Sequence, residues 1–304
     1  MTNHILDFSA CPARLRVKHH QLLVQRESHQ DVTIPLAEVA VVLVSHPQVT
    51  YTQAVLVGIA ESSGVFVACD QKNLPVGLFL PLTGHSTQTE RFVAQATASV
   101  PTRKRLWQQI VKSKIAAQAA VLNQLSDNDH GLAAMIPSVK SGDPTNIEAQ
   151  AARRYWPYLF ADAEFRRNPK HEDQNSLLNY GYAVLRAIIA RAICASGLHP
   201  SLGLHHRNKY NAYCLADDLM EPFRPIVDLC VAQYIQDNSL ENGVDQESKR
   251  QIIESLTSRL LHQGEQRTLF DIATRLTASL AGVFLKKDDH LDLPTGKPAW
   301  STIP

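Results

Sequence analysis

The sequence contains few cysteines, and their positions argue against the usual cysteine-based sites. Five cysteines are scattered through 304 residues, and none are spaced as Cys-x-x-Cys. This pattern argues against both a zinc knuckle and a disulfide framework, so a reducing cytoplasm is the expected compartment.

The sequence also lacks a segment that would direct the chain into a membrane. The first ten residues carry Asp7 where a secretory leader needs a positive start and an apolar run. The longest apolar stretch, Ala183 to Ala195, is interrupted by Arg186 and Arg191. We therefore expect a cytoplasmic protein that does not enter a membrane.

Glycine-rich phosphate-binding motifs and internal repeats are absent too. Neither Gly-x-x-x-x-Gly-Lys-[Ser/Thr] nor Gly-x-Gly-x-x-Gly occurs, which argues against a reaction driven by a nucleotide. No period of about 20–50 residues is visible, so solenoid and propeller architectures are set aside.

What the sequence does contain is a change of pattern along its length. In the N-terminal part apolar and polar positions alternate, and residues 14–18 and 21–25 around His19 and His20 predict a hairpin. Short runs at 38–44 and 65–69 predict strands, and the run at 54–60 predicts a helix. We predict an α+β fold whose N-terminal domain, residues 1–84, is small and mainly β.

From about Thr89 onward the pattern is helical. It predicts a larger, all-α C-terminal domain, residues 85–304, with a loop-like tail after about residue 287. A nearly apolar helix, capped by Asn175 or Ser176 and ending at Gly197, is expected in its core.

A second predicted helix, from Thr102 to about Leu125, has a mixed face. Lys114 and Gln118 interrupt its apolar side. We expect these long side chains to reach the surface rather than to line a cavity or cross a domain contact.

The net charge of +1 is small, but the basic residues are clustered. One cluster lies at 103–114 in a segment without acidic residues, and another follows Glu148. Such clusters predict binding to a polyanion, and the alternative is a solvated helix face. The predicted nucleic-acid contacts are Arg103, Arg105, Lys112, Arg153, Arg154, Arg166 and Arg167.

Carboxylate and imidazole side chains gather in two stretches, 142–148 and 203–224. They are Glu148, His205, His206, Asp217, Asp218 and Glu221. Oxygen ligands combined with a neutral imidazole suit Mg²⁺ or Mn²⁺, ions that mainly act on phosphate esters. The combination therefore predicts a metal-dependent site for phosphate chemistry.

Each candidate ligand also has a purely structural interpretation. Glu148 stands three residues after Thr145, which is the spacing of a capping box at a helix start. Asp217 and Asp218 stand where a helix N-cap is expected, with Glu221 one turn further on. No single one of these residues distinguishes a metal site from ordinary helix chemistry.

Six blocks occur in a fixed order along nearly the whole chain. They are Pro75-Val-Gly-Leu, Arg105 to Ile115, Gly142 to Glu148, Asn179-Tyr-Gly-Tyr, Gly203 to His206, and Asp218 to Pro225. With these blocks the chain resembles the CRISPR-associated integrase family, the catalytic subunit of the spacer-acquisition machinery. The resemblance is to the branch found with systems that use a single RNA-guided effector nuclease (type II).

The resemblance implies a ligand set for Mg²⁺ or Mn²⁺. Glu148 matches the first metal-ligand glutamate of the family and Glu221 the second acidic ligand. The family pattern of glycine followed by the ligand three positions later selects His206, with His205 as the second choice. Asp218 matches an acidic position that looks supporting.

The resemblance also implies a reaction and partners. Family members join the 3′ hydroxyl of a captured DNA fragment to a phosphodiester of the repeat array by transesterification. A homodimer joined through the β domains is implied, with two such dimers bridged by the smaller CRISPR adaptation protein in a heterohexamer on double-stranded DNA. Two alternatives stay open: a metal-dependent DNA nuclease that uses water, and a non-catalytic DNA-binding scaffold.

Overall fold

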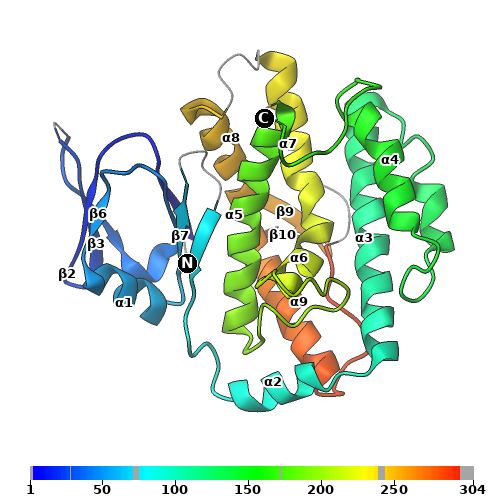
Figure 1. The fold of residues 1–304 in the computed structure, drawn as a ribbon, viewed down its shortest axis with the longest axis horizontal. Coiled ribbons are helices and arrows are strands. Elements are labelled where there is room, and N and C mark those ends of the chain that lie inside the picture. The colour runs from blue at the N-terminus through cyan, green and yellow to red at the C-terminus, as the bar shows by residue number, and fades with distance from the viewer. Residues whose placement is uncertain (1–2, 28, 71–74, 172, 239–243, 295–304) are drawn as a thin grey trace.

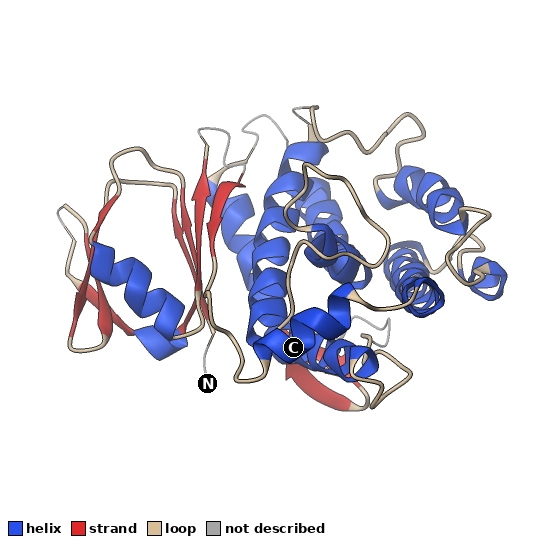
Figure 2. Cartoon of the chain, turned by 60° about the horizontal axis from the view of Figure 1, so that its bottom comes forward, coloured by secondary structure: helices blue, strands red, loops and turns tan. Residues whose placement is uncertain are grey.

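Two four-stranded sheets with a helix between them form the N-terminal region of the protein (Figures 1 and 2). The computed structural model describes residues 3–27, 29–70, 75–171, 173–238 and 244–294. The sheets have the strand orders β4-β3-β2-β6 and β1-β5-β7-β8. Their elements are β1 His4–Phe8, β2 Arg14–Lys18, β3 Gln21–Gln25, β4 Val32–Pro35, η1 Leu36–Glu38, β5 Val39–Val44, β6 Thr50–Tyr51, α1 Gln53–Glu61, β7 Val65–Cys69 and β8 Pro75–Phe79.

The first sheet is built on the predicted hairpin. β2 and β3 pair antiparallel, with Lys18 opposite Gln21, so His19 and His20 form a two-residue turn. Both histidines have a left-handed backbone conformation, with φ of 50° and 58°. Two successive positive φ angles are what a tight turn needs to match the twist of its strands. The hairpin prediction is confirmed.

The second sheet joins the two regions of the chain, and its central strand β5 is buried on both faces. β5 pairs in parallel with both β1 and β7. Because side chains alternate across a strand, Val42 faces α1 and the first sheet, whereas Val41 and Val65 face helix α5. A strand covered on both sides is apolar throughout, which explains the run Val39–Val44.

The C-terminal region is mainly helical and lies against the free face of the second sheet (Figure 1). Its elements are α2 Gln88–Ala96, α3 Val100–Ser126, η2 Ala133–Ser138, α4 Ile147–Leu159, α5 Gln174–Ala195, α6 Cys214–Met220, η3 Glu221–Phe223, α7 Arg224–Asp237, α8 Gln246–Thr257, β9 Arg259–His262, β10 Glu265–Thr268 and α9 Leu269–Phe284.

Helix α5 forms the centre of this region and contacts α6, α7, α8 and α9. By length and composition it could span a membrane, but 83% of its most apolar window is buried inside the protein, as in a core helix. The expected caps Asn175 and Ser176 are wrong. Asp173 caps the helix by accepting a hydrogen bond from the Asn175 amide, because it is the residue that directly precedes the first turn.

The α+β class, with a small β-rich N-terminal region and a larger helical region, is confirmed. The helical region is not all-α, because β9 and β10 form an antiparallel hairpin before α9. Its turn residues Gln263 and Gly264 are both left-handed, and this Gln-Gly pair was the missed sequence signal.

The change from strands to helices falls between Phe79, the end of β8, and Gln88, the start of α2. The division into two domains at residue 84 stays a prediction. Residues 288–294 form neither helix nor strand, as expected for the tail, and the rest of that predicted loop lies outside the described residues.

Candidate metal site

Glu148 lies in the first turn of α4, at the end of a tightly bonded loop. The Asp143 carboxylate accepts hydrogen bonds from the amides of Ile147 and Glu148, both at 2.9 Å. Asn146, left-handed with φ of 54°, is the N-cap of the helix. The capping box expected between Thr145 and Glu148 therefore does not form, since other side chains already bind the helix amides. The Glu148 side chain is therefore not used as a cap, and it points toward α3.

Glu221 lies at a break between two helices. α6 and α7 are separated by the single turn η3, where Pro222 has no amide hydrogen to continue the helix. Glu221 is 3% exposed and lies against α3. Asp217 and Asp218 lie inside α6, which begins at Cys214, so the expectation that they cap a helix is wrong.

Lys114 joins the two glutamates. Its Nζ atom on α3 lies 2.6 Å from Glu148 Oε1 and 2.6 Å from Glu221 Oε2. The expectation that Lys114 and Gln118 reach the surface is wrong, because they are only 9% and 2% exposed. For Lys114 the reason is the charge of two carboxylates from other segments, which makes burial of its ammonium group tolerable.

The pKa values reflect this arrangement of charges. Burial alone would lower the pKa of Lys114, but the carboxylates of Glu221 and Glu148 outweigh it and raise the pKa. Burial would likewise raise the pKa of Glu221, yet Arg224 and Lys114 hold it below its usual value. Both groups are therefore charged at neutral pH.

The Glu221 carboxylate keeps bonding capacity to spare. Arg224 Nε lies 3.0 Å from Oε1 and Lys114 lies against Oε2. The geometry of neither contact is that of a hydrogen bond. Arg224 Nε and Glu221 Oε2 are both buried without a hydrogen-bond partner. A buried carboxylate oxygen that meets only an ammonium charge is a site that another cation could occupy.

His206 is held by Asp218, which is fully buried. The Asp218 carboxylate accepts hydrogen bonds from the amides of Leu204, His205 and His206 at 2.6, 3.0 and 3.2 Å. It also bonds His206 Nδ1 at 2.6 Å. With Nδ1 bonded to a carboxylate, Nε2 is the ring nitrogen that can act as a ligand. The hydrogen bond that His206 donates to the Asp218 carboxylate is the main cause that raises the pKa of His206.

Gly203 lets the histidine loop approach α6 closely. A Cβ atom there would lie 2.5 Å from the His206 carbonyl oxygen and 2.9 Å from Asp218 Oδ2. His205 takes a different role from its neighbour, because its ring stacks on buried Trp107 of α3, with ring centres 4.3 Å apart and planes 6° apart. The two adjacent histidines therefore differ in their contacts: His205 packs on an indole, and His206 bonds a carboxylate.

The structure brings Glu148 and Glu221 together and places His206 near enough to lower the pKa of Glu221. In the described ranges no three His, Cys, Asp or Glu side chains stand close enough, as arranged, to hold a metal ion. The donor types nevertheless fit Mg²⁺ or Mn²⁺, and the Lys114 ammonium group is a cation already lodged between the two carboxylates.

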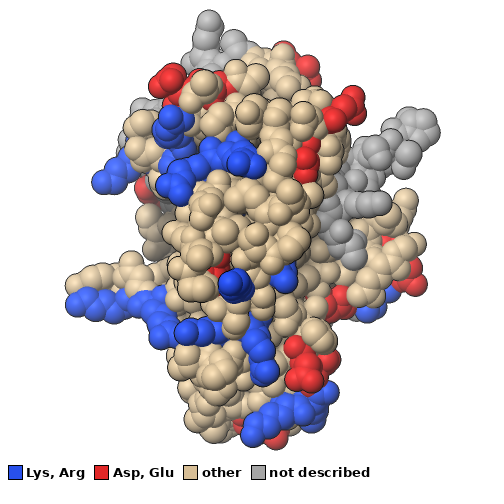
Figure 3. Space-filling model, turned by 90° about the vertical axis from the view of Figure 1, so that its right-hand side faces the viewer, with Lys and Arg blue, Asp and Glu red and all other residues tan. Residues whose placement is uncertain are grey.

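The predicted DNA contacts lie on or beside α3 and α4. Figure 3 shows many lysine and arginine side chains on the side of the molecule that α3 and α4 form in Figure 1. Arg105, Arg153, Arg154 and Arg166 are exposed, whereas Arg103, Lys112 and Arg167 are half-buried. Arg167 is not on a solvated helix face, because it donates hydrogen bonds to Asn175 and Asn179.

Three residues that shape the site are not predicted from the sequence: Lys114, Asp143 and Trp107. The polar break in the apolar face of α3 was the available signal for Lys114. Asp143 and Trp107 act through the amides of α4 and the ring of His205, and nothing in their sequence spacing indicates such partners.

Comparisons with known proteins point to one family. A sequence model of the family described as CRISPR associated protein Cas1 matches residues 9–264. The CRISPR-associated endonuclease Cas1 of Neisseria meningitidis serogroup C (strain 8013) is 36% identical over 287 residues, which cover 92% of each chain.

Two solved structures share the fold over nearly their full length. A casposase bound to integration product has a TM-score of 0.82 with 20% identity, covering 100% of this chain and 96% of that one. A Cas1 protein from Thermotoga maritima has a TM-score of 0.75 with 16% identity, covering 95% of this chain and 99% of that one.

Proposed function

The chain belongs to the CRISPR-associated Cas1 family, and from that premise we propose that it is a divalent-metal-dependent DNA integrase of CRISPR adaptation. The similarity to the Neisseria relative is consistent with the predicted type II branch. The observation that carries the proposal is the meeting of Glu148 and Glu221, from different segments, at one buried cation.

Three side chains would hold the metal, Mg²⁺ or Mn²⁺. Glu148 and Glu221 supply carboxylate oxygens, and His206 supplies Nε2 while Asp218 keeps its Nδ1–H in place. The metal, when bound, supplies positive charge that polarises the attacked phosphate. Lys114 holds the carboxylates close together and neutralises them while no ion is bound.

The proposed reaction exchanges one phosphodiester for another. The 3′-hydroxyl oxygen of the captured fragment bonds to the phosphorus of a repeat phosphodiester, and the bond from that phosphorus to the 3′ oxygen of the repeat strand breaks. The proton of the attacking hydroxyl ends on the departing 3′ oxygen. The number of phosphodiesters is unchanged, so no nucleotide is consumed.

The proposed partners are double-stranded DNA, a second copy of this chain, and Cas2, the smaller adaptation protein, in a cytoplasmic heterohexamer. Support comes from a solved Cas6-RT-Cas1–Cas2 complex that has this fold, with a TM-score of 0.74, and from a solved Cas1–DNA complex. The homodimer contact through the β region is carried over from the family resemblance.

A strand-transfer assay tests the reaction class. Supercoiled DNA with a repeat, a short duplex fragment and the small partner protein are incubated with Mg²⁺, Mn²⁺ or chelator. We expect joined product only with metal, and loss of at least a hundredfold for Glu148→Gln and Glu221→Gln. Glu247→Gln, an exposed change in α8, is the matched control and should keep wild-type joining.

Three results would count against the proposal. Joined product in the sample with chelator would show that the reaction does not require a metal ion. Shortened strands without joining would favour the nuclease that uses water. Undiminished joining by both glutamine variants would favour a scaffold whose partner carries the chemistry.

A further inference from the structure

Gln95, in the last turn of α2, is a buried polar side chain that lies outside the candidate metal site. It is 3% exposed and is the one buried residue among the nine of α2, all of which the structure describes. Helix α2 follows the β-rich region in the chain and precedes α3 (Figure 1). A buried amide is expected to have hydrogen-bond partners, because an unpaired one destabilises the fold.

The side-chain amide of Gln95 is fully used by the main chain of one loop. Its Oε1 atom accepts a hydrogen bond from the His199 amide at 2.8 Å. Its Nε2 atom donates to the carbonyl oxygens of His199 and Leu202, both at 2.9 Å. A side-chain amide has two donor hydrogens and an acceptor oxygen, so each of these groups has a partner. Gln95 therefore fixes the path of the backbone in this loop.

The loop that Gln95 holds is the one that carries His206. We call residues 199–206 the histidine loop. Asp218 binds the amides of its last three residues, and Gln95 binds its first half. Gly203 alone lies between the two bonded parts, and it packs closely against Asp218 and the His206 carbonyl oxygen. A displacement of the first half of the loop is therefore transmitted to His206.

Two further side chains of α2 contact the same part of the chain. Arg91 Nη1 donates a hydrogen bond to the Ser196 carbonyl oxygen at 2.7 Å, in the turn that follows α5. The Phe92 ring meets the His199 ring edge to face, with ring centres 5.4 Å apart. Gln95 is four residues after Arg91, so both hydrogen bonds come from one face of the helix. This face of α2 is therefore a support for the histidine loop.

We propose that Gln95 is a positioning residue that keeps His206 where it can join Glu148 and Glu221 at one divalent ion. This role rests on the proposed function, which assigns His206 to an ion. Without the Gln95 amide, one N–H group and two carbonyl groups of the loop lose their partner. The loop would move to bring them to water, and His206 would move with it. Residues that orient a metal ligand typically change the affinity for the metal about 10- to 100-fold.

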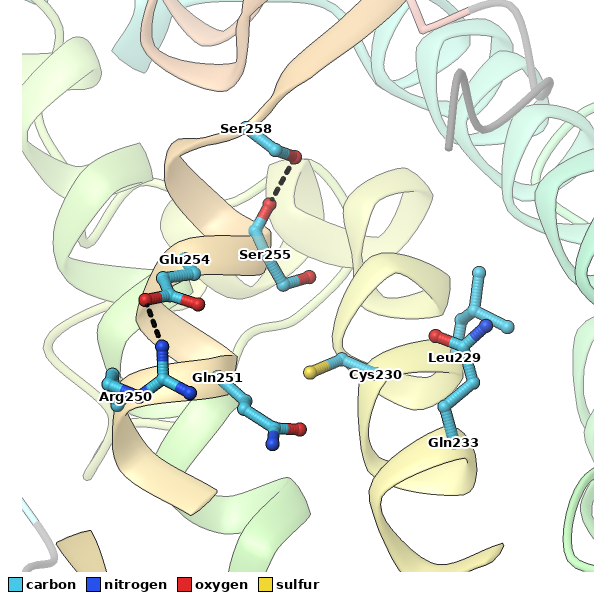
Figure 4. Close-up of a pocket in the computed structure, with 8 residues that line it drawn as sticks. All are labelled: Leu229, Cys230, Gln233, Arg250, Gln251, Glu254, Ser255 and Ser258. Carbon is cyan, nitrogen blue, oxygen red and sulfur yellow. Dashed lines mark hydrogen bonds and ion pairs between the residues drawn. The ribbon is translucent and has the colours of Figure 1, made fainter. Parts of the chain in front are cut away.

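Gln251 of α8 provides a matched control. It lies in the wall of a cleft of about 420 Å³ between α7 and α8, and Figure 4 shows its side chain extending from α8 toward α7. Its Nε2 atom donates to Glu247 Oε1 of the same helix at 2.9 Å. Gln251→Met therefore removes an amide of the same size without releasing a hydrogen bond to a second segment.

Binding of Mn²⁺ to the full chain tests the proposal, with the free ion measured by electron paramagnetic resonance. We expect Gln95→Met, which keeps the length of the side chain, to weaken Mn²⁺ binding about tenfold. In a His206→Ala background the same substitution should add less than about twofold, because the ligand that it displaces is already absent. Gln251→Met should bind Mn²⁺ as tightly as the wild type.

Hydrogen exchange in chelator tests the loop itself, independently of any metal. The amides of Leu204, His205 and His206 should exchange about tenfold faster in Gln95→Met than in the wild type, because local opening of the loop becomes easier. Exchange in α8 should not change. Gln95→Asn is shorter by one methylene and cannot reach both carbonyl groups, so it should act in the same direction. It replaces Gln95→Met in both measurements if the methionine variant does not fold.

Two results would overturn the proposal and leave the proposed function intact. In one, Gln95→Met and Gln95→Asn bind Mn²⁺ as tightly as the wild type, whereas His206→Ala binds it more weakly. In the other, the loss is the same with and without His206, which would mean that Gln95 acts on the fold as a whole. If instead wild type and His206→Ala bind Mn²⁺ equally, and exchange in Gln95→Met is faster only in the histidine loop, the metal site of the proposed function is wrong and Gln95 supports only the loop.

Discussion

Lys114 places a positive charge between two carboxylates that would otherwise repel each other in a buried site. The arrangement satisfies Glu148 and Glu221 while no metal ion is bound, and it also competes with a metal ion for the same oxygens. A buried ion pair of this kind adds little stability in total, but removal of one partner leaves an uncompensated charge.

The first prediction concerns Lys114→Met. Without metal the free energy of unfolding should fall by roughly 3–5 kcal/mol, since two carboxylates lose their shared counter-charge. Mn²⁺ should then stabilise the variant more than it stabilises the wild type, because the ion no longer displaces an ammonium group. Thermal unfolding with chelator and with Mn²⁺ measures both effects.

Lys112→Met is the control for this experiment. Lys112 is half-buried on the same helix but makes no ion pair with the described residues. The free energy of unfolding of Lys112→Met should stay within about 0.5 kcal/mol of the wild-type value. Equal Mn²⁺ stabilisation of Lys114→Met and wild type would show that the lysine and the ion do not share a site.

Asp228 is a second buried carboxyl group with consequences for pH dependence. It accepts hydrogen bonds from Tyr155, at 3.1 Å, and from Tyr182. Burial raises its pKa to about 7, against the opposing effect of these hydrogen bonds and of Arg224. The folded protein therefore binds a proton at Asp228 that the unfolded chain releases at a lower pH.

The second prediction follows from the raised pKa of Asp228 in the folded protein. The contribution of Asp228 to stability is fully present below a pH of about 4 and is lost as the pH rises through about 7. The free energy of unfolding of Asp228→Asn, relative to wild type, should therefore rise by at most roughly 2.7 kcal/mol between pH 5 and pH 8, because the effect ends near pH 7. Urea unfolding at the two pH values measures it. A difference that is independent of pH would mean that Asp228 is ionised throughout.

Single residues show where reasoning from sequence alone succeeds and where it stops. Glu148, His206 and Glu221 were named from residue type, spacing and resemblance, and the first and last do meet at one place. The role of Lys114 could not be predicted, because the charges that make its burial tolerable come from α4 and η3. The pattern of apolar and polar residues in α3 gives no indication of those carboxylates.

At the scale of secondary-structure elements, local signals were sufficient for the long helices and the first hairpin. The helix predicted at Thr102 to about Leu125 is α3, Val100–Ser126, and the run at 54–60 is α1. Hairpin β9–β10 was missed because its strands are four residues each, within a region whose pattern is otherwise helical.

The third prediction concerns the turn of hairpin β2–β3. His20 has φ of 58°, a conformation that costs a residue with a Cβ atom roughly 1–2 kcal/mol. His20→Gly should therefore raise the free energy of unfolding by about 0.5–1 kcal/mol. His20→Val should lower it by more than that, because a β-branched side chain is strained there. Urea midpoints compare the two. Stabilisation by valine would mean that the turn is not left-handed.

At the scale of the whole molecule, one sheet belongs to two hydrophobic cores. Val42 packs with α1 and the first sheet, and its neighbour Val41 packs with the helical region. Other contacts cross the same boundary: Arg191 of α5 donates to the Ser63 carbonyl oxygen, and Tyr180 donates to Asp7. The two regions are therefore expected to unfold together.

The fourth prediction tests this cooperativity. Val42→Ala removes apolar contacts only from the N-terminal core and should destabilise by roughly 1–3 kcal/mol. Trp107 and Trp156 report on the helical region, yet the midpoint of their fluorescence change should fall with that of far-ultraviolet circular dichroism. Two separated transitions, with the tryptophan signal unmoved, would show that the regions unfold independently. Arg105→Ala, exposed on α3, serves as the control.

Glu221 has a further consequence, because its two oxygens are shared between cations of different origin. Lys114 lies on one side, and Arg224 lies on the other. A divalent ion bound to the Glu221 carboxylate weakens the ion pair between Glu221 and Arg224. An anion bound to Arg224 weakens the same ion pair, so the carboxylate binds the divalent ion more strongly. Linkage requires each ligand to favour the other by the same factor, so a divalent ion at Glu221 and an anion at Arg224 would bind cooperatively, in either order.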